Sequence, residues 1–533
     1  MENQSFDVKR LDHHGLVAGV IADLGLIEFF NTSVGAGSGD VSTGVAIASM
    51  IVNGLGFTDR PLSLSPQFFE QVPVDLLFGD DLEAHQLNRH RLGRALDDVY
   101  AAGTNELFSK MAYQAAQLEG VKTHVQTNDT TSISLTGEYE FGEGGDTLKV
   151  LHGYSKDHRP DLKQVIHELV VSCDGGVPLH CQSCDGNKSD SEIFRKRVSL
   201  LKKNFTMQSD SLWIADSKLY NEETIRSLEQ TRFLTRIPET YTLAKETIDT
   251  AFDKEWSQNE KGLNFQRFEL EHFGIPQSWL VVWSEEGYQR AEKTLLKKQT
   301  KEFNAVSQEC FHLQAQRFFC LKDAEKALGK AMKKWNLVQA QSTEIKEHKK
   351  HTKKGRPHPQ DPFTMEYQVI IQIERKDLNK RSQRKAAFIL GTSAKDLSDE
   401  DIIANYKKQG HVERGFRFLK DPYFFASSLY LKKPERIQSL LMIMTLSLLV
   451  YTIAQRRLRQ AMEQAHHSIA NQAGVSIQRP TMRWVFQIFW GINVIKVRTQ
   501  KGVQTILQGL QDIHRDLLHL FSGHDALSLY ETT

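Results

Sequence analysis

The stretch Tyr406–Lys420 reads YKKQGHVERGFRFLK, and the interpretation of the rest of the chain starts from it. At about 100° of rotation per helical residue, its polar side chains share one narrow stripe of a helix. Those side chains belong to Tyr406, Gln409, Glu413 and Lys420. The neighbouring stripe is apolar and would anchor the helix in a core; it holds Val412, Phe416 and Leu419. The spacing predicts a helix that presents a phenol, an amide, a carboxylate and an ammonium group at one place.

Two aspartates upstream occupy positions that favour a functional role. Asp129 lies at the end of a β-prone stretch, and Asp216 directly follows a short apolar strand predicted at Leu212–Ala215. In α/β sheets, functional groups collect at the carboxyl ends of strands. Together with Glu413 these carboxylates suit a hard divalent cation such as Mg²⁺, and a pair of such ions can promote phosphoryl transfer. Because a single aspartate after a strand is more often a turn or a cap, the helical stripe carries more weight.

Hydrophobic periodicity and turn residues predict an α/β fold with five regions in the 533 residues. We predict a helical N-terminal domain at 1–117, which could bind DNA ends, the first part of an α/β domain at 118–237, an insertion with strands and a basic helical segment at 238–385, the second part of the α/β domain at 386–460, and a C-terminal helical region at 461–533. Asp216 and Glu413 are 197 positions apart (413 − 216), too far for a simple loop.

Charge is distributed unevenly along the chain. The 67 Lys and Arg residues against 66 Asp and Glu residues give a formal net charge of +1, which excludes a uniformly basic protein. Between Arg290 and Arg356, however, 17 basic residues face 7 acidic ones, a net charge of +10. This segment ends in a basic loop with Lys353, Lys354 and Arg356, and arginine suits narrow A·T-rich minor grooves. A solvated basic loop is the commoner interpretation of such a motif alone, but the asymmetry favours a surface for a polyanion.

The five cysteines are too few for a disulfide framework and favour a reducing compartment. The spacing of Cys181 and Cys184 is compatible with zinc, yet a zinc site usually needs a second ligand pair, so we predict strand-core cysteines.

No signal peptide is visible in the first twenty residues. The most apolar run, Leu440–Tyr451, is too short to span a bilayer and predicts a buried core helix.

The stripe at Tyr406–Lys420 resembles the Tyr-x2-Arg-x3-Glu-x6-Lys signature of DDE transposases of bacterial insertion sequences, in the IS-four-like superfamily. Gln409 stands where that signature has Arg. Further resemblance covers both aspartate motifs and the segments between them, at residues 124–132, 153–164, 186–190 and 214–217. The helical N-terminal segment is also similar to the one that precedes the catalytic domain in one branch of the family. The resemblance extends over about residues 8 to 460.

The resemblance implies an RNase H-like catalytic domain interrupted by a mostly β insertion. It implies cut-and-paste transposition, in which water cleaves the element ends and the freed 3′-hydroxyl attacks target DNA. Carried over residue by residue, Asp129, Asp216 and Glu413 would be the catalytic residues and the ligands of two Mg²⁺ ions, with Mn²⁺ as a substitute. Tyr406, Gln409 and Lys420 would lie at DNA phosphates near the cleavage point.

The remaining expectations concern partners. Arg159 could position DNA, although a structural salt bridge is equally compatible with its surroundings. We expect double-stranded DNA as the partner, both as terminal inverted repeats and as target, a homodimer on DNA, no membrane, and the nucleoid-containing cytoplasm of a bacterium. Two alternatives are a catalytically impaired DNA-binding regulator of transposition and a metal-dependent nuclease without strand transfer. The complete carboxylate set disfavours the first, and the long insertion disfavours the second.

Overall fold

The computed structural model describes residues 5–37, 39–57, 62–79, 81–139, 147–204, 211–229, 231–260, 262–350, 364–422, 431–499, 502–521 and 525–531. The chain divides into two compact units. The larger unit comprises residues 1–235, 271–277 and 392–533, and the smaller unit comprises 236–270 and 278–391. Each unit has a hydrophobic core of its own.

The N-terminal part of the larger unit is helical, as the apolar spacing predicts. Its helices are α1 (His14–Asp23), α2 (Leu26–Val34), α3 (Thr43–Leu55), α4 (Ser65–Phe69), α5 (Val74–Phe78), α6 (Arg89–Ala102) and α7 (Thr104–Leu118). Polar caps start two of them: the Ser42 side chain accepts a hydrogen bond from the Val45 amide, and Asn88 caps α6 in the same manner. These helices share one continuous core with three strands of the sheet described next. The predicted boundary at residue 117 is therefore a change of secondary structure inside one compact unit.

Five neighbouring strands of a nine-stranded mixed sheet form the centre of the larger unit. These strands are β2 (Val125–Leu135), β3 (Lys163–Ser172), β4 (Pro178–Cys184), β5 (Leu212–Ala215) and β6 (Arg232–Ile237), in the spatial order β4-β3-β2-β5-β6. Strand β3 runs antiparallel to both β2 and β4, whereas β5 runs parallel to β2 and to β6. The predicted β3–β4 hairpin is confirmed, and its turn contains Gly175 and Gly176 with φ of 85° and 75°. Glycine is required there because other residues rarely adopt positive φ.

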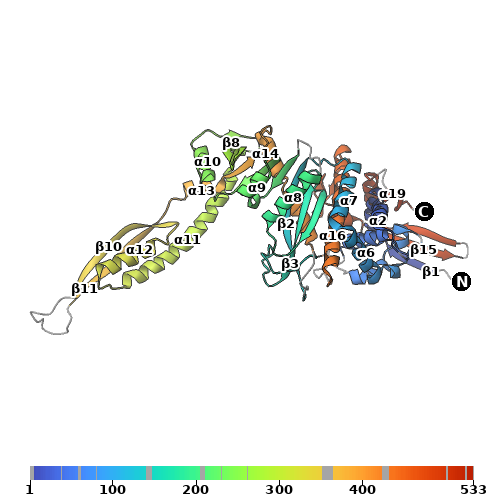
Figure 1. Cartoon of the computed structure of the whole chain (residues 1–533), viewed down its shortest axis with the longest axis horizontal. Helices are drawn as coiled ribbons and strands as arrows, with labels where there is room; N and C mark the ends of the chain where they lie inside the picture. Colours follow the sequence, from blue (N-terminus) through green and yellow to red (C-terminus); the bar gives the residue numbers. More distant parts are fainter. Residues whose placement is uncertain are drawn as a thin grey trace, which may run out of the picture. The chain divides into compact units, whose positions relative to one another are not determined.

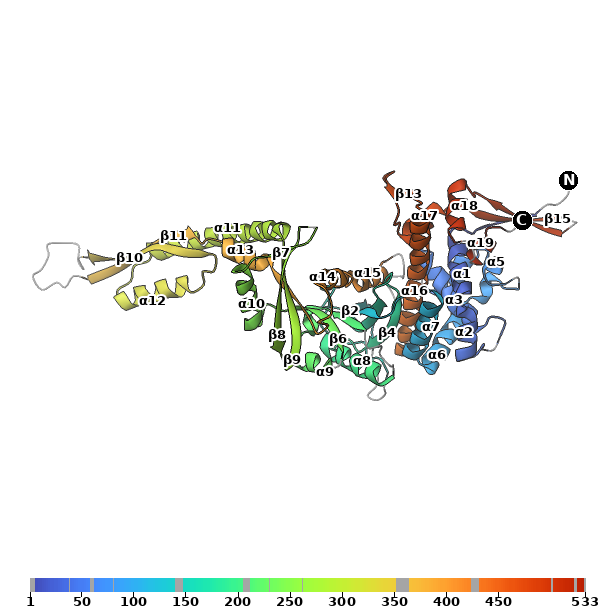
Figure 2. The same cartoon turned by 90° about the horizontal axis from the view of Figure 1, so that it is seen from above.

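Helices flank this sheet. They are α8 (Asp190–Asn204), α9 (Glu222–Ser227), α14 (Asp399–Lys407), α15 (Gly410–Leu419) and α16 (Pro434–Gln464), with the 3₁₀ turn η3 (Ser217–Leu219) after β5. Helix α16 packs against α3, α6, α7 and β4 (Figures 1 and 2). By length and composition α16 could cross a membrane, as could α1 and α2 taken together. Since 89% of the most apolar window of α16 is buried inside the structure, it is a core helix, as predicted.

The C-terminal region differs from the predicted helical region. It contains α17 (Met482–Ile488), α18 (Asp512–His519) and α19 (Asp525–Ser528), but also β13 (Ile469–Ala470), β14 (Ser476–Ile477), β15 (Asn493–Thr499) and β16 (Gly502–Gln508). Strand β15 pairs antiparallel with β16 and with β1 (Ser5–Arg10), so the two ends of the chain form one small sheet. The prediction of helix alone was wrong because β15 alternates β-branched and polar residues, a period-two pattern that favours a strand.

The smaller unit is mixed rather than mostly β. It contains α10 (Thr242–Phe252), α11 (Glu285–Ala315), α12 (Leu321–Met332) and α13 (Asn379–Ala386), together with β7 (Ser257–Gln258), β8 (Asn264–His272), β9 (Ile275–Trp283), β10 (Val338–Lys350), β11 (Thr364–Arg375) and β12 (Phe388–Thr392). The β10–β11 hairpin packs against α11 and α12 (Figure 1). Apolar residues of α11 and α12 supply half of that core, so helix is integral to the unit.

A buried ion cluster ties α16 to the N-terminal helices. The Arg457 guanidinium donates to Asp23 at 2.5 Å and to both carboxylate oxygens of Glu119 at 2.5 and 2.9 Å. All three side chains are nearly inaccessible, with exposures of 7%, 11% and 12%. Removing one member of such a cluster leaves its partners buried without compensation.

We therefore expect Arg457→Met to lower the free energy of unfolding by about 3 kcal/mol, since two carboxylates lose their counter-charge. Urea denaturation at neutral pH measures this change. The matched control is Arg515→Met, because Arg515 forms an exposed pair with Asp512 and should contribute less than about 1 kcal/mol. Equal effects of the two substitutions would contradict a structural role of the cluster.

Candidate active site

The pairing of β2 with β5 brings the two predicted aspartates together. Asn128 lies opposite Ala215 in this parallel register, so Asp129 and Asp216 are the next residues along the two strands. Strand β2 continues beyond Asp129 to Leu135, which places Asp129 inside a strand rather than at its end. Strand β5 stops at Ala215, and the Asp216 carboxylate caps η3 by accepting a hydrogen bond from the Ser217 amide at 2.6 Å. Asp216 thus combines the predicted position with the commoner role of a cap.

Both aspartates line one small cavity in the larger unit. Its volume is about 10 Å³, which is room for the centre of one water-sized particle. The other lining residues are Asn128, Thr130, Asp190, Phe194, Lys218 and Leu219. The Asn128 side chain is 1% exposed, and its Oδ1 accepts no hydrogen bond from any described residue. The cavity therefore offers three carboxylates and one unused amide oxygen.

Lys156 supplies positive charge to this cluster. Its Nζ donates to the backbone oxygen of Thr130 at 2.6 Å and to Thr130 Oγ1 at 2.8 Å. The same Nζ lies 3.1 Å from Asp190 Oδ2 and 3.8 Å from Asp129 Oδ1. Thr130 Oγ1 in turn donates to Asp190 Oδ1 at 2.5 Å. Lys156, Thr130 and Asp190 thus form a closed polar triangle beside Asp129.

A second polar network contacts β2 at Asn128, the residue before Asp129. Glu168 on β3 is fully buried and forms an ion pair with Arg197 on α8 at 2.8 Å. Asn128 Nδ2 donates to the other Glu168 oxygen at 3.0 Å, and Arg197 also donates to Gln182 on β4 at 2.5 Å. A buried charge pair without these additional hydrogen bonds would be strongly unfavourable. The network fixes the residue next to Asp129 against two strands and one helix.

The electrostatic environment of Asp129 disfavours its ionised form. The pKa of Asp129 is raised from 3.8 to about 6; burial is the largest cause, and the nearby carboxylates of Asp190 and Asp216 act in the same direction. The Lys156 ammonium and the hydrogen bond from the Thr130 amide act in the opposite direction. A carboxyl group whose neighbours are carboxylates in a confined space is typical of a site that receives a cation.

The helical stripe predicted at Tyr406–Lys420 is divided between two helices. Helix α14 ends at Lys407 and α15 begins at Gly410. Between them the chain tightens, because His411 and Val412 bond to carbonyls three residues earlier, those of Lys408 and Gln409. A single uniform helix was therefore wrong, and the angular phase of Tyr406 relative to Glu413 shifts at this junction. Glycine at position 410, a poor helix former, lies at the break.

Glu413 belongs to α15 and Lys420 directly follows it; the helix packs against β2 and β3 through the predicted apolar stripe. Glu413 is exposed and is not among the residues that line the cavity of Asp129 and Asp216. Lys420 forms a bidentate ion pair with Asp157 at 2.7 and 2.8 Å. Because Asp157 directly follows Lys156, one short loop contacts both the aspartate cluster and α15.

The other predicted DNA contacts are placed as follows. Tyr406 is half-buried at the end of α14, and Gln409 is the residue before α15. Arg159 forms an exposed ion pair with Asp161, whose oxygens lie 2.6 to 2.8 Å from the guanidinium. The predicted contacts Lys353, Lys354 and Arg356 lie outside the described residues.

The donor atoms fit a hard divalent cation, since the cavity is lined by carboxylate and amide oxygens. Within the described ranges, however, no three His, Cys, Asp or Glu side chains have the spacing of a ready metal site. The cysteines of β4 are free, and burial raises the pKa of Cys181 and Cys184 to about 12, as expected for strand-core thiols. The site thus has the right ligand chemistry at Asp129 and Asp216, with Glu413 on a neighbouring helix.

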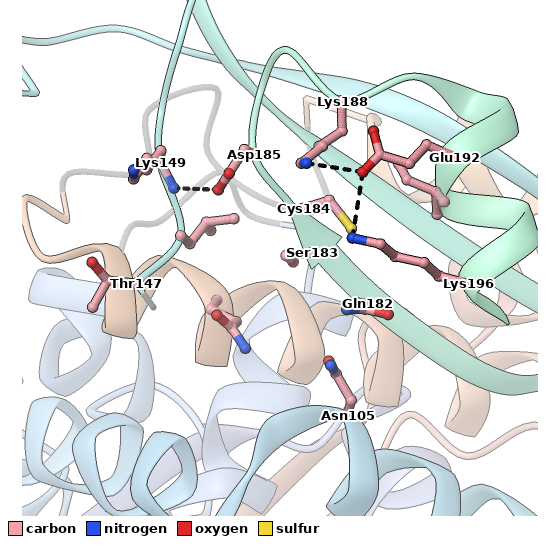
Figure 3. Close-up of a pocket in the computed structure, with 13 residues that line it drawn as sticks. Asn105, Thr147, Lys149, Gln182, Ser183, Cys184, Asp185, Lys188, Glu192 and Lys196 are labelled. Carbon is pink, nitrogen blue, oxygen red and sulfur yellow. Dashed lines mark hydrogen bonds and ion pairs between the residues drawn. The ribbon is translucent and has the colours of Figure 1, made fainter. Parts of the chain in front are cut away.

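A larger cavity of about 520 Å³ is lined by the start of α8, the end of β4 and the loop between them, among other residues (Figure 3). Glu192 accepts hydrogen bonds from Lys188 and Lys196 at 2.9 and 3.3 Å, and Asp185 accepts from the Lys149 amide at 2.8 Å. Its charged groups are thus largely paired with one another, so this cavity offers less free charge than the aspartate cluster.

Known protein families match two regions of the chain. Residues 122–450, more than half of the chain, match the family described as the transposase DDE domain, and residues 6–113 match a domain of unknown function, DUF4277. The chain belongs to the DDE transposase family. No curated protein matches it. A cryo-EM structure of the piggyBac transposase synaptic complex with hairpin DNA aligns over 89% of this chain and 80% of that chain at 9% identity, but its TM-score of 0.36 supports no argument.

In this transposase, three residues at the site went unassigned in the sequence analysis. Lys156, Asp190 and Asn128 surround Asp129, yet none was assigned a role from spacing alone. A signal existed, because Lys156 and Asp190 both lie in the segments 153–164 and 186–190 that resemble the family. Their convergence on Asp129 depends on strand pairing and loop packing, which spacing along the chain does not encode.

The transposase should become more stable when Asp129 is neutralised. Because the folded chain binds the Asp129 proton more tightly than the unfolded chain does, stability falls as the pH rises from about 4 to about 6 and stays lower above that range. We expect Asp129→Asn, without divalent ions, to gain on the order of 2 kcal/mol at pH 7.5 and little at pH 4. Urea denaturation at both pH values, with the exposed Asp512→Asn as control, measures the difference. An equal gain at both pH values would contradict this origin.

Proposed function

We propose that this transposase catalyses cut-and-paste transposition of a bacterial insertion sequence. In this reaction it hydrolyses the phosphodiester bonds at the element ends and joins the freed 3′-hydroxyl to target DNA. The observation that carries the proposal is the placement of Asp129 and Asp216 side by side on parallel strands, within the region that matches the transposase DDE domain. The resemblance of Tyr406–Lys420 to the IS-four-like signature supports the insertion-sequence context.

An RNase H-like catalytic domain is the corresponding fold proposal. Its support is the strand order β4-β3-β2-β5-β6, with a first antiparallel hairpin pair followed by strands parallel to β2. In chain order these strands are third, second, first, fourth and fifth. The first catalytic aspartate then belongs to the first strand and the second aspartate to the end of the fourth, which is where Asp129 and Asp216 lie.

For the metal, we propose that Asp129, Asp216 and Glu413 hold two Mg²⁺ ions, with Mn²⁺ as a substitute. When bound, these ions would supply the charge that activates an attacking oxygen and stabilises a leaving oxygen. Other residues of the chain hold the ligands in place: the Glu168–Arg197 network fixes the strand of Asp129, and Lys156 neutralises part of the local negative charge. Lys420, close to Asp157, and Tyr406 are placed in our proposal at the phosphates of the cleaved strand, with Gln409 beside them.

Metal binding should be detectable without catalysis. A ligand that binds only the folded state raises the midpoint of unfolding. We expect millimolar Mg²⁺ or Mn²⁺ to raise the thermal midpoint of the wild type and to leave that of Asp216→Asn unchanged. Asp161→Asn is the control, because Asp161 is exposed and pairs with Arg159 away from the cavity. Equal shifts in the wild type and in Asp216→Asn would exclude Asp216 as a ligand.

Catalysis is tested at the third carboxylate. We expect Glu413→Gln to lower Mg²⁺-dependent cleavage of the element's own ends by at least about a thousandfold, since a proposed metal ligand is lost while its shape is kept. Binding of the same DNA, measured without divalent ions, should change little. The control is Glu223→Gln, an exposed carboxylate on α9 that pairs with Arg195.

Undiminished cleavage by Glu413→Gln would remove Glu413 from the active site. The regulator alternative has one observation in its favour, namely that Glu413 does not line the cavity of the two aspartates. That alternative predicts specific DNA binding by the wild type without cleavage or strand transfer in any divalent ion. A nuclease without strand transfer predicts cleaved ends that never join to target DNA.

For partners and location we propose double-stranded DNA, as terminal inverted repeats and as target, and the bacterial cytoplasm beside the nucleoid. Two ends must be cut together, so we expect a homodimer on DNA. The proposed DNA surface includes Arg159 and the basic segment with Lys353, Lys354 and Arg356, whose net charge of +10 between Arg290 and Arg356 supports contact with a polyanion.

A further inference from the structure

A cavity of about 490 Å³ lies in the larger unit beside the helix that carries Glu413. Elements α15, α16 and the start of α17 contribute to it, together with the β3–β4 turn. Four arginines line it: Arg414, Arg417, Arg459 and Arg483. Its volume falls within the range of natural ligand pockets, which are about 300–1,000 Å³.

Most of this positive charge has no counter-charge. Asp421 is the one carboxylate among the described lining residues, and it forms an ion pair with Arg483. Four guanidinium groups against one carboxylate leave a net charge of +3. Among the described residues, Arg414 and Arg417 take part in no ion pair or hydrogen bond, and Arg459 donates only to the neutral backbone oxygen of Pro480 at 2.9 Å.

Burial and the nearby positive charge lower the pKa of two neighbouring groups, His411 and Arg459. His411 also lines the cavity, and burial together with Arg414, Lys408 and Arg459 lowers its pKa to about 4. The pKa of Arg459 is lowered as well, first by burial and then by Arg479 and Arg414. Arg459 and Arg483 are half-buried, whereas Arg414 and Arg417 are exposed. Like charges held close together are unfavourable unless an anion compensates them. The cavity therefore concentrates positive charge that an anion would compensate.

The cavity also has an organised aromatic side. Phe57, Phe418 and Tyr451 line it, and the Arg483 guanidinium lies over the Phe57 ring at 4.9 Å from the centroid. Phe57 adopts a φ of 51°, a backbone conformation that is rare for a bulky residue and is strained. The Tyr451 hydroxyl accepts a hydrogen bond from the Arg483 amide at 3.0 Å. The guanidinium of Arg483 is thus held in place before any ligand arrives.

The cavity lies beside α15, the helix that carries Glu413, and this position indicates which anion it would bind. Arg414 follows Glu413 directly, and Arg417 lies one turn further along the same helix. An anion in the cavity would therefore lie against α15, next to the exposed carboxylate that the proposed function assigns to catalysis. The polyanion that the proposed function brings to this helix is DNA, and arginine matches phosphate geometry with its planar fork of donors.

We propose that this arginine cavity binds the sugar–phosphate backbone of a DNA strand that passes α15. The proposal rests on the proposed function, because the DNA is that of the transposition reaction. Contacts of this kind fix the register and orientation of DNA and carry no base sequence. The cavity would hold a strand next to Glu413 whatever its sequence, which suits flanking or target DNA as well as element ends.

The test uses the full-length protein and a duplex of random sequence, without divalent ions so that nothing is cleaved. We expect Arg414→Gln and Arg459→Gln each to weaken binding about tenfold. Each should also reduce the slope of log affinity against log salt by about 0.9, the value for one lost phosphate contact. Arg515→Gln removes the same charge from the surface of α18, and it should change neither quantity.

A second arm separates DNA from a free nucleotide, which offers the same phosphate chemistry. ATP is titrated into the wild type and into Arg459→Gln. ATP binding in the wild type that Arg459→Gln abolishes, with DNA affinity unchanged, would overturn the proposal in favour of a nucleotide site. DNA affinities of both cavity variants equal to that of Arg515→Gln would overturn it outright, while cleavage by the wild type would leave the proposed function intact. Absence of DNA binding by the wild type would overturn both.

Discussion

The parallel pairing of β2 with β5 is the constraint on which the candidate active site depends. All four residues of β5 are buried. A slip of one residue in the pairing of β5 with β2 would move each of these side chains to the opposite face of the sheet, where its packing partners differ. The register is therefore fixed by burial, and it sets Asp129 and Asp216 side by side. The remaining parts of the site are arranged around this pair: Lys156 balances its charge, and the Glu168–Arg197 pair holds the adjacent Asn128.

The elements around this pair were largely predictable because their signals are local. The apolar run at Leu212–Ala215 and the Asp-Gly-Gly turn after β3 are short patterns with strong physical preferences, and both predictions are confirmed. The small C-terminal sheet was missed, because β15 pairs with β1 at the opposite end of the chain. The break between α14 and α15 was missed for another reason, since one glycine and two tightened hydrogen bonds change helix phase without ending the apolar pattern.

The adjacency of the two aspartates of the candidate site was predictable, whereas the residues around them were not. Asp129 and Asp216 each follow from a strand and a motif, but Lys156 reaches Asp129 from a loop and Asp190 reaches it from the start of a helix. Clusters of positive charge were also predictable only where the charged residues are neighbours in the sequence. The basic segment between Arg290 and Arg356 is visible in the sequence, whereas the arginines of the cavity beside α15 come from separate elements and become one cluster only in the fold.

The small sheet of β1, β15 and β16 has a consequence for how the protein is made. Strand β1 pairs with residues near 495, and the Tyr530 hydroxyl donates to the backbone oxygen of Asp12 at 2.5 Å while accepting from the Leu16 amide at 3.3 Å. The N-terminal helices therefore complete their core only after the residues near 495 and Tyr530 have left the ribosome. Until those residues emerge, the first helices lack partners that they have in the folded unit.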